Sequence, residues 1–64
     1  MNKDQVMQCI PSDGDGVHIS DIYRLMSIVH MNDEPKRKAV RKIVVNALDR
    51  GELKTNQRFA LTQA

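Results

Sequence analysis

Positively charged side chains form the pattern in this sequence that points most directly to a chemistry. The segment 36–58 holds eight of the ten Lys and Arg residues against Asp49 and Glu52, which gives it a charge of +6. Residues 1–34 hold two cations against six carboxylates, a charge of −4. Because clustered cations attract phosphate groups, this asymmetry predicts electrostatic binding to a polyanion, above all a nucleic acid. The eight cations are Lys36, Arg37, Lys38, Arg41, Lys42, Arg50, Lys54 and Arg58.

The run Lys36–Lys38 has a second interpretation, as a helix face that is charged only for solubility. Two observations favour binding. The run lies at the start of a predicted helix, where the helix dipole disfavours cations, so stability alone does not explain it. A predicted hairpin with two further cations follows the same helix, and the two halves of the chain carry opposite charge.

Reactive side chains elsewhere form no catalytic or metal-binding pattern. Cys9 is the single cysteine, so no intrachain disulfide can form, and its apolar neighbours indicate a core position. His18 and His30 have no Cys or His partner at ligand spacing. The Asp13–Gly16 run has alternating carboxylates, but it lacks the third oxygen ligand and the distant Glu of an EF-hand loop. We therefore expect no metal, no cofactor and no enzymatic activity.

The length of 64 residues predicts a single domain, residues 1–64. A domain of this size buries only about 60% of the surface of its unfolded chain, which leaves no room for a deep substrate pocket beside a core. Tyr23 and Phe59 are the aromatic residues, and we expect both in the core with the aliphatic and Met side chains. No apolar run is long enough to span a membrane and the first ten residues lack signal-peptide features, so we expect a cytoplasmic protein.

A first helix and a very short strand are predicted in the acidic half. The helix covers about residues 3–10, with Asn2 as its N-cap and Gln5 completing a capping box. The segment 11–16 has the Pro, Ser, Asp and Gly composition of a turn and ends the helix. The strand is predicted over residues 17–19.

A second helix is predicted over residues 20–31. Ser20 is the expected N-cap, and Asp21 in the first turn suits the helix dipole. The helix is expected to end near Met31 and Asn32, because Asn tolerates the left-handed conformation that closes helices. The apolar residues at helical spacing are Ile22, Leu25, Met26 and Val29.

A third helix is predicted over residues 35–50. Pro35 suits the first turn, where its missing N–H has no helical partner, and Gly51 supplies the stop. The apolar stripe of this helix comprises Val40, Ile43, Val44, Ala47 and Leu48. At 100° per residue, the side chains that point away from the stripe are Lys38, Arg41, Lys42, Val45 and Asn46.

A hairpin is predicted over residues 52–62, with a polar tip near residues 55–57. Strand alternation places Phe59 and Leu61 on one face, which we expect to be the core face. The order of elements is therefore helix, short strand, helix, helix and hairpin.

The third helix has an apolar face to anchor it and a basic face that could enter the major groove of DNA. Arg41 is the strongest candidate for a base contact, because Arg can bind guanine with two hydrogen bonds and this residue projects from mid-helix. Asn46 lies late in the helix and is a weaker candidate. If about six cations contact phosphates, log affinity should fall with log salt with a slope of about −5. The predicted DNA-binding residues are Lys36, Arg37, Lys38, Arg41, Lys42, Lys54, Gln57 and Arg58.

Over about residues 3–62 the chain resembles the small winged-helix DNA-binding proteins of bacteria, their phages and plasmids. The resemblance rests on 20–26 as positioning helix, 36–50 as recognition helix, and 51–53 with 58–61 as the strands of a short wing. It implies a mainly α fold with a small β-hairpin, a three-helix winged helix-turn-helix. It also implies a sequence-specific transcriptional regulator that binds duplex DNA, with the hairpin on the flanking backbone. Because one module of 64 residues forms a small interface with DNA, we expect it to bind as a homodimer.

A second function remains open from the sequence. A winged-helix shape can also serve as a protein–protein interaction module, such as a phage-type inhibitor or an adaptor of a regulator. Its acidic half would then meet a basic partner, or its basic helix an acidic one. RNA binding is less favoured, since stacking on RNA bases needs exposed aromatic residues and both aromatics are predicted in the core.

Overall fold

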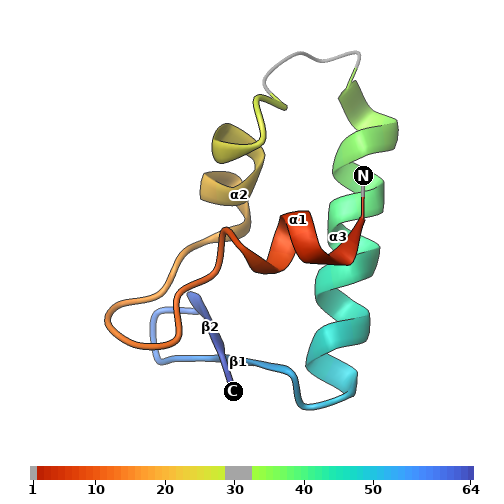
Figure 1. The fold of residues 1–64 in the computed structure, drawn as a ribbon. Coiled ribbons are helices and arrows are strands. Elements are labelled where there is room, and N and C mark those ends of the chain that lie inside the picture. Colours follow the sequence, from red (N-terminus) through yellow and green to blue (C-terminus); the bar gives the residue numbers. More distant parts are fainter. Residues whose placement is uncertain (1, 29–32) are drawn as a thin grey trace.

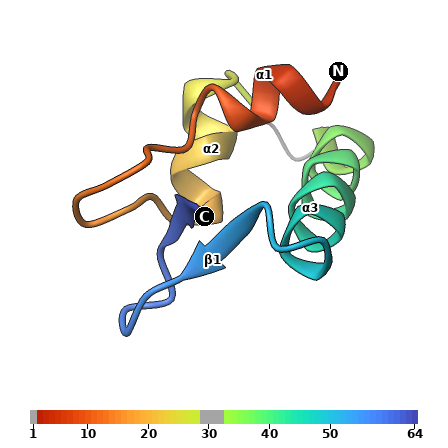
Figure 2. The same ribbon diagram turned by 60° about the horizontal axis from the view of Figure 1, so that its bottom comes forward.

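The computed structural model describes residues 2–28 and 33–64 of the chain. It has three helices and a two-stranded antiparallel hairpin, in the order predicted (Figure 1). This is a mainly helical winged-helix layout. Figures 1 and 2 show α2 and α3 on opposite sides of α1, with the hairpin beneath them. The elements are α1 (Lys3–Met7), α2 (Ile19–Leu25), α3 (Glu34–Asp49), β1 (Leu53–Thr55) and β2 (Leu61–Gln63).

One core joins all of these elements. The predicted stripe of α3 supplies its centre, with Val40, Val44 and Ala47 buried and Ile43 and Leu48 packed at its edge. The i, i+3 and i+4 spacing of these residues explains why one side of α3 is apolar. The other buried members of the cluster are Val6, Ile10, Ile22, Ile28, Leu53 and Leu61.

The start of α1 follows the prediction, but its end does not. The Asn2 side chain accepts the Gln5 N–H at 2.9 Å, and the Gln5 side chain accepts the Asn2 N–H at 3.0 Å, so the capping box is confirmed. The predicted extension to residue 10 is wrong, because the helix ends at Met7. Pro11 has no N–H to donate to the Met7 carbonyl and disfavours helix at the residue before it. The Gln63 side chain donates instead to the carbonyls of Met7 (3.1 Å) and Ile10 (2.9 Å), which ties this turn to β2.

The predicted strand over 17–19 is a single bridge between Val17 and Leu61, which adds one pair to the edge of the hairpin. Ile19 already belongs to α2, so Ser20 is not the N-cap; that position is His18. Its backbone N–H donates to the Asp21 carboxylate at 3.1 Å, which confirms Asp21 in the first turn.

The predicted end of α2 near residue 31 is also wrong, since the helix ends at Leu25. Ser27 takes a left-handed conformation with φ of 59°. Its N–H donates to Arg24 (3.0 Å) and the Ile28 N–H to Tyr23 (2.7 Å), the two bonds of a Schellman motif. The predictions for Val29, Met31 and Asn32 fall outside the described residues.

The same motif closes α3, where the sequence did predict it. Gly51 has φ of 72°, and its N–H donates to Leu48 at 3.1 Å, while the Glu52 N–H donates to Ala47 at 2.9 Å. At the other end α3 begins at Glu34, one residue before the prediction, with Pro35 in the first turn. No helix in the described part of the chain is long and apolar enough to cross a membrane.

Candidate nucleic-acid interface

The outer face of α3 consists of Lys38, Lys42, Val45 and Asn46, all exposed as the helical period predicts. Lys38 and Lys42 stand one turn apart on the same side of the helix. Neither forms a salt bridge with any described residue. This face therefore presents two ammonium groups to solvent together with an amide and a half-exposed apolar side chain.

Lys36 is exposed as well, but on another side of the helix. Two residues before Lys38 corresponds to a rotation of 200°, so Lys36 extends from the first turn beyond the body of the domain. It too has no salt bridge within the described residues. The predicted basic run at the start of α3 is thus spread around the helix.

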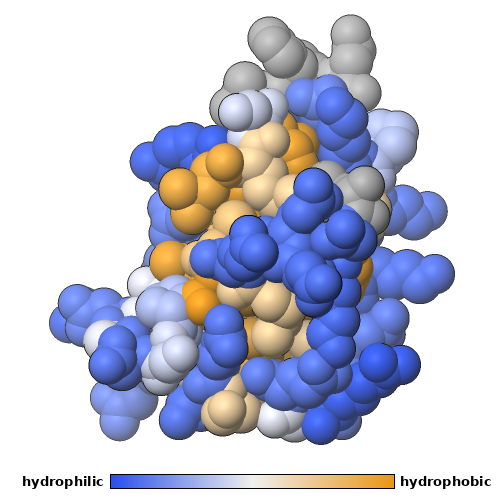
Figure 3. All heavy atoms as spheres, in the orientation of Figure 1, coloured by the Kyte–Doolittle hydropathy of each residue, from blue (hydrophilic) through white to orange (hydrophobic). Residues whose placement is uncertain are grey.

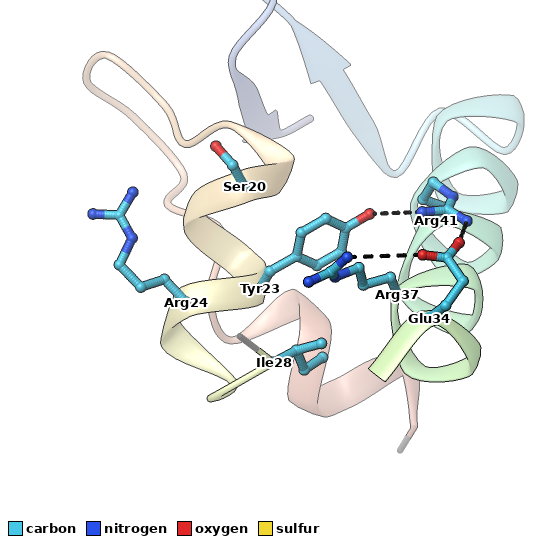
Figure 4. A pocket seen from close by; sticks show the side chains of 7 residues that line it. All are labelled: Ser20, Tyr23, Arg24, Ile28, Glu34, Arg37 and Arg41. Atoms are coloured by element: carbon cyan, nitrogen blue, oxygen red, sulfur yellow. Dashed lines mark hydrogen bonds and ion pairs between the residues drawn. The ribbon is translucent and has the colours of Figure 1, made fainter. Parts of the chain in front are cut away.

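Arg37 and Arg41 face α2 and are engaged there (Figure 4). The Arg41 guanidinium donates to Glu34 Oε1 at 2.6 Å and to Tyr23 Oη at 3.3 Å. A nitrogen of Arg37 lies 3.8 Å from Glu34 Oε2, and its guanidinium lies over the Tyr23 ring, 5.9 Å from the centroid. Such a cation–π contact adds to the hydrogen bond from Arg41 to Tyr23, which links the two helices. Arg41 is exposed, as predicted. The sequence did not predict its contacts with Glu34 and Tyr23.

Charge coupling at this contact is visible in the acid–base behaviour of both groups. The hydrogen bond from Arg41 and its charge hold the pKa of Glu34 below its ordinary value of 4.5. The bonds to Glu34 and Tyr23 raise the pKa of Arg41 further above its already high value. Both groups are therefore ionised near neutral pH. Their ion pair lies within α3 and holds the Arg41 guanidinium where it bonds to Tyr23 of α2, beside an open cleft of about 500 Å³.

The hairpin tip, residues 56–60, holds the second group of predicted residues. Gln57 and Arg58 are exposed on it, and Lys54 is exposed on the strand that leads to it. Lys54 and Arg58 have no salt bridge within the described residues. Figure 2 shows this tip projecting away from the helices, on the side of the molecule opposite α3.

Asn56 organises the tip, a role that its sequence position alone did not indicate. Its side-chain oxygen accepts the N–H groups of Arg58 (2.8 Å) and Ala60 (3.1 Å). Its side-chain nitrogen donates to the carbonyl of Asp15 at 2.8 Å, which joins the tip to the turn over residues 11–16. Asn side chains often bond to the backbone two residues further on in a turn, so an Asn at the start of the tip is the sequence signal for this role.

Phe59 does not lie in the core, so the prediction from strand alternation is wrong. The residue is 81% exposed, and its backbone is left-handed with φ of 62°. It lies in the turn, before β2 begins at Leu61, where alternation no longer applies. Tyr23, the other aromatic, packs against the core as expected.

Comparison of the chain with family models, with curated proteins and with solved structures gives no significant match. Within the described residues, no group of three His, Cys, Asp or Glu side chains could hold a metal ion. The functional argument therefore rests on the two cationic groups, the outer face of α3 and the hairpin tip.

Proposed function

We propose that this protein is a sequence-specific duplex-DNA-binding regulator of transcription, of the winged-helix kind that its sequence resembles. The observation that carries the proposal is the combination of an exposed, unbraced cationic face on α3 with exposed cations on a hairpin of the same small domain. Cations that only stabilised the fold would be paired, as Arg37 and Arg41 are.

Dimensions support this reading. An α-helix fits the major groove, which is about 12 Å wide. A neighbouring groove lies about half a helical turn away, roughly 17 Å along the DNA axis. The longest extent of the domain is 31 Å, which is comparable with one helical turn of DNA, about 34 Å along the axis.

The braced arginines have a different role in this proposal from the free lysines. Lys38 and Lys42 contact phosphates directly, since nothing has to be broken first. Arg41 contacts a base only after its bond to Glu34 breaks, so the base and the Glu34 carboxylate compete for the same guanidinium. Arg41 therefore binds DNA only when its bond to Glu34 is broken, whereas Lys38 and Lys42 bind without breaking a salt bridge between described residues.

The test is fluorescence anisotropy of a labelled random-sequence duplex across a salt series. Five of the predicted DNA-binding cations are exposed and form no salt bridge within the described residues: Lys36, Lys38, Lys42, Lys54 and Arg58. They predict a log–log slope of about −4 to −5. The double substitution Lys38→Ala/Lys42→Ala should weaken binding and reduce the magnitude of the slope by about 2.

A matched control removes the same charge elsewhere. Lys3→Ala/Arg24→Ala also deletes two cations, but from α1 and α2, where both residues form ion pairs. It should change the slope much less. Equal losses in the two double variants would show that only net charge matters, and an absence of salt-dependent binding would reject the proposal.

We also propose that binding is dimeric and occurs in the cytoplasm, without a cofactor. A single module of this size forms a small interface with DNA, and two modules on adjacent half-sites supply the missing affinity. Analytical ultracentrifugation with and without duplex DNA tests this. A complex with one protein per duplex at saturation would contradict it.

A second candidate function is a protein–protein interaction module. It is favoured by Leu25 on α2 and Val45 on α3, which are 64% and 53% exposed. Hydrophobic residues also reach the surface among hydrophilic ones on the face shown in Figure 3. Under this alternative, charge reversal at Arg41 and Lys42 leaves activity intact, whereas DNA binding would not survive it.

A further inference from the structure

Within the hairpin tip, residues 57–59 form a three-residue loop that two backbone hydrogen bonds close. The Phe59 N–H donates to the carbonyl of Asn56 at 3.0 Å, and the Asn56 N–H donates to the carbonyl of Ala60 at 3.0 Å. The third loop residue in this arrangement adopts the left-handed conformation, and glycine is the usual residue there. This chain has Phe59 at that position, with φ of 62°.

Phenylalanine is unfavourable at this position on two counts. A side chain with a Cβ is strained in the left-handed region. The ring also receives little compensation from packing, since it is 81% exposed. Three other turns of the chain do use glycine at positive φ, at Gly14, Gly16 and Gly51. The folded domain alone therefore gives no reason for an aromatic residue at the tip.

The surroundings of Phe59 identify the chemistry of its partner. Arg58 precedes it in the loop and Lys54 is exposed on β1, while Asp15 contributes one carboxylate beside Asn56, Gln57 and Arg58. An exposed apolar ring on a hairpin that also exposes two cations matches a ligand that offers flat apolar surfaces between phosphates. The bases of DNA have that character where a base step is unstacked, since each base then exposes a π face between the flanking phosphates.

We propose that Phe59 is an aromatic wedge that enters the minor groove of duplex DNA and inserts between neighbouring base pairs. The proposal rests on the DNA-binding function proposed above and specifies what the hairpin does in it. Apolar side chains carried into the minor groove unstack a base step and bend the duplex toward the major groove. Lys54 and Arg58, exposed on the same hairpin, neutralise phosphates near the step.

The tip is held in place for such an insertion. Asn56 fixes the loop through its two accepted N–H groups and its bond to the Asp15 carbonyl. Gly16, the residue after Asp15, lies so close to the hairpin that an added Cβ would be 2.7 Å from the Leu61 carbonyl oxygen. A braced tip loses little conformational freedom on binding, which is what a wedge requires.

The experiment uses two substitutions of Phe59 and the same labelled random-sequence duplex. Phe59→Gly removes the ring and relieves the left-handed backbone, so the variant should melt at the same temperature or higher. Its affinity for the duplex should fall about tenfold or more. The salt slope should stay unchanged, because no cation is lost. Phe59→Trp should keep the affinity, and its tryptophan should be quenched by stacking when DNA is added.

The tryptophan introduced by Phe59→Trp is the only one in the chain, so the fluorescence reports on the tip alone. Phe59→Gly binding as tightly as wild type, while Lys38→Ala/Lys42→Ala binds weakly, would overturn the wedge and leave the DNA-binding function standing. Unchanged tryptophan emission on bound DNA would overturn it too, and would point to a protein partner for the ring. Absence of salt-dependent binding by the wild type would overturn both proposals.

Discussion

The outer face of α3 and the hairpin tip both expose cations, but they are built by different means. On α3 the helical period alone decides which side chains face outward, and Lys38 and Lys42 are exposed with no salt bridge to any described residue. At the tip, side-chain hydrogen bonds from Asn56 and a link to the Asp15 carbonyl decide the geometry. The first surface is a consequence of local sequence, and the second depends on tertiary contacts.

This difference has a consequence for robustness. A helix face keeps its shape when one exposed residue is changed, because backbone bonds and the buried stripe hold it. A braced loop loses its shape when one brace is removed. We therefore expect substitutions that support the tip to have larger structural effects than substitutions on the outer face of α3.

The largest effect is expected from Gly16→Ala. The added Cβ would meet the Leu61 carbonyl oxygen at 2.7 Å, and φ of 78° is strained for alanine. Strain of about 1–2 kcal/mol and overpacking of about 1–3 kcal/mol together predict a loss of about 3 kcal/mol. For a domain of this size the melting temperature should fall by roughly 10 °C or more, measured by circular dichroism.

Gly14→Ala is the matched control, because Gly14 has nearly the same φ of 82° but nothing within 4 Å of an added Cβ. It should cost only the backbone strain, about 1 kcal/mol. Equal destabilisation by the two substitutions would mean that the loop is not pressed against β2.

Asn56→Ala is expected to have the next largest effect, about 2 kcal/mol. It removes two accepted bonds and one donated bond, each contributing about 0.5–1.5 kcal/mol, less some compensation by water at this partly exposed site. Urea unfolding measures it. Gln57→Ala is the neighbouring control, since Gln57 is exposed, and should change stability by less than about 0.5 kcal/mol.

A smaller difference in melting temperature is expected between a substitution on the side of α3 that faces α2 and one on its outer face. Arg41→Ala removes the bonds to Glu34 and Tyr23 and should lower the melting temperature. Lys42→Ala, the next residue, removes no salt bridge between described residues and substitutes a better helix former, so it should leave stability unchanged or slightly raised. If Lys42→Ala destabilised the fold as much as Arg41→Ala, the distinction between braced arginine and free lysine would fail.

The sequence predicts the features that local signals determine and misses those that depend on tertiary contacts. The third helix was predicted to within one residue at each end, because its period, Pro35 and Gly51 are local signals. Ser27 closes α2 with the same bonds that Gly51 makes for α3, yet a serine at positive φ gives no such signal. The Met7 carbonyl at the end of α1 is bonded by Gln63, more than fifty residues away in the chain, and no local pattern predicts that contact.

The candidate site divides in the same way. The exposure of Lys38 and Lys42 could be predicted, since only the helical period is involved. The engagement of Arg41 could not, because it requires the position of Tyr23 on another helix. Phe59 was placed in the core because alternation was extended into a turn whose geometry Asn56 controls.

The smallest predicted effect concerns pH, and it tests the braced side of α3 by itself. Because the pKa of Glu34 is lowered in the folded state, its ionised form favours folding at pH values above its ordinary pKa of 4.5. That contribution should be lost as pH falls through the lowered pKa, when the carboxyl is protonated and Arg41 loses its charged partner. Melting curves from about pH 6 to pH 3 should therefore decline less steeply for Glu34→Gln than for wild type. Lys42→Ala should decline as wild type does, since Lys42 takes no part in the brace; a flattened profile in that variant would place the pH-sensitive contact elsewhere.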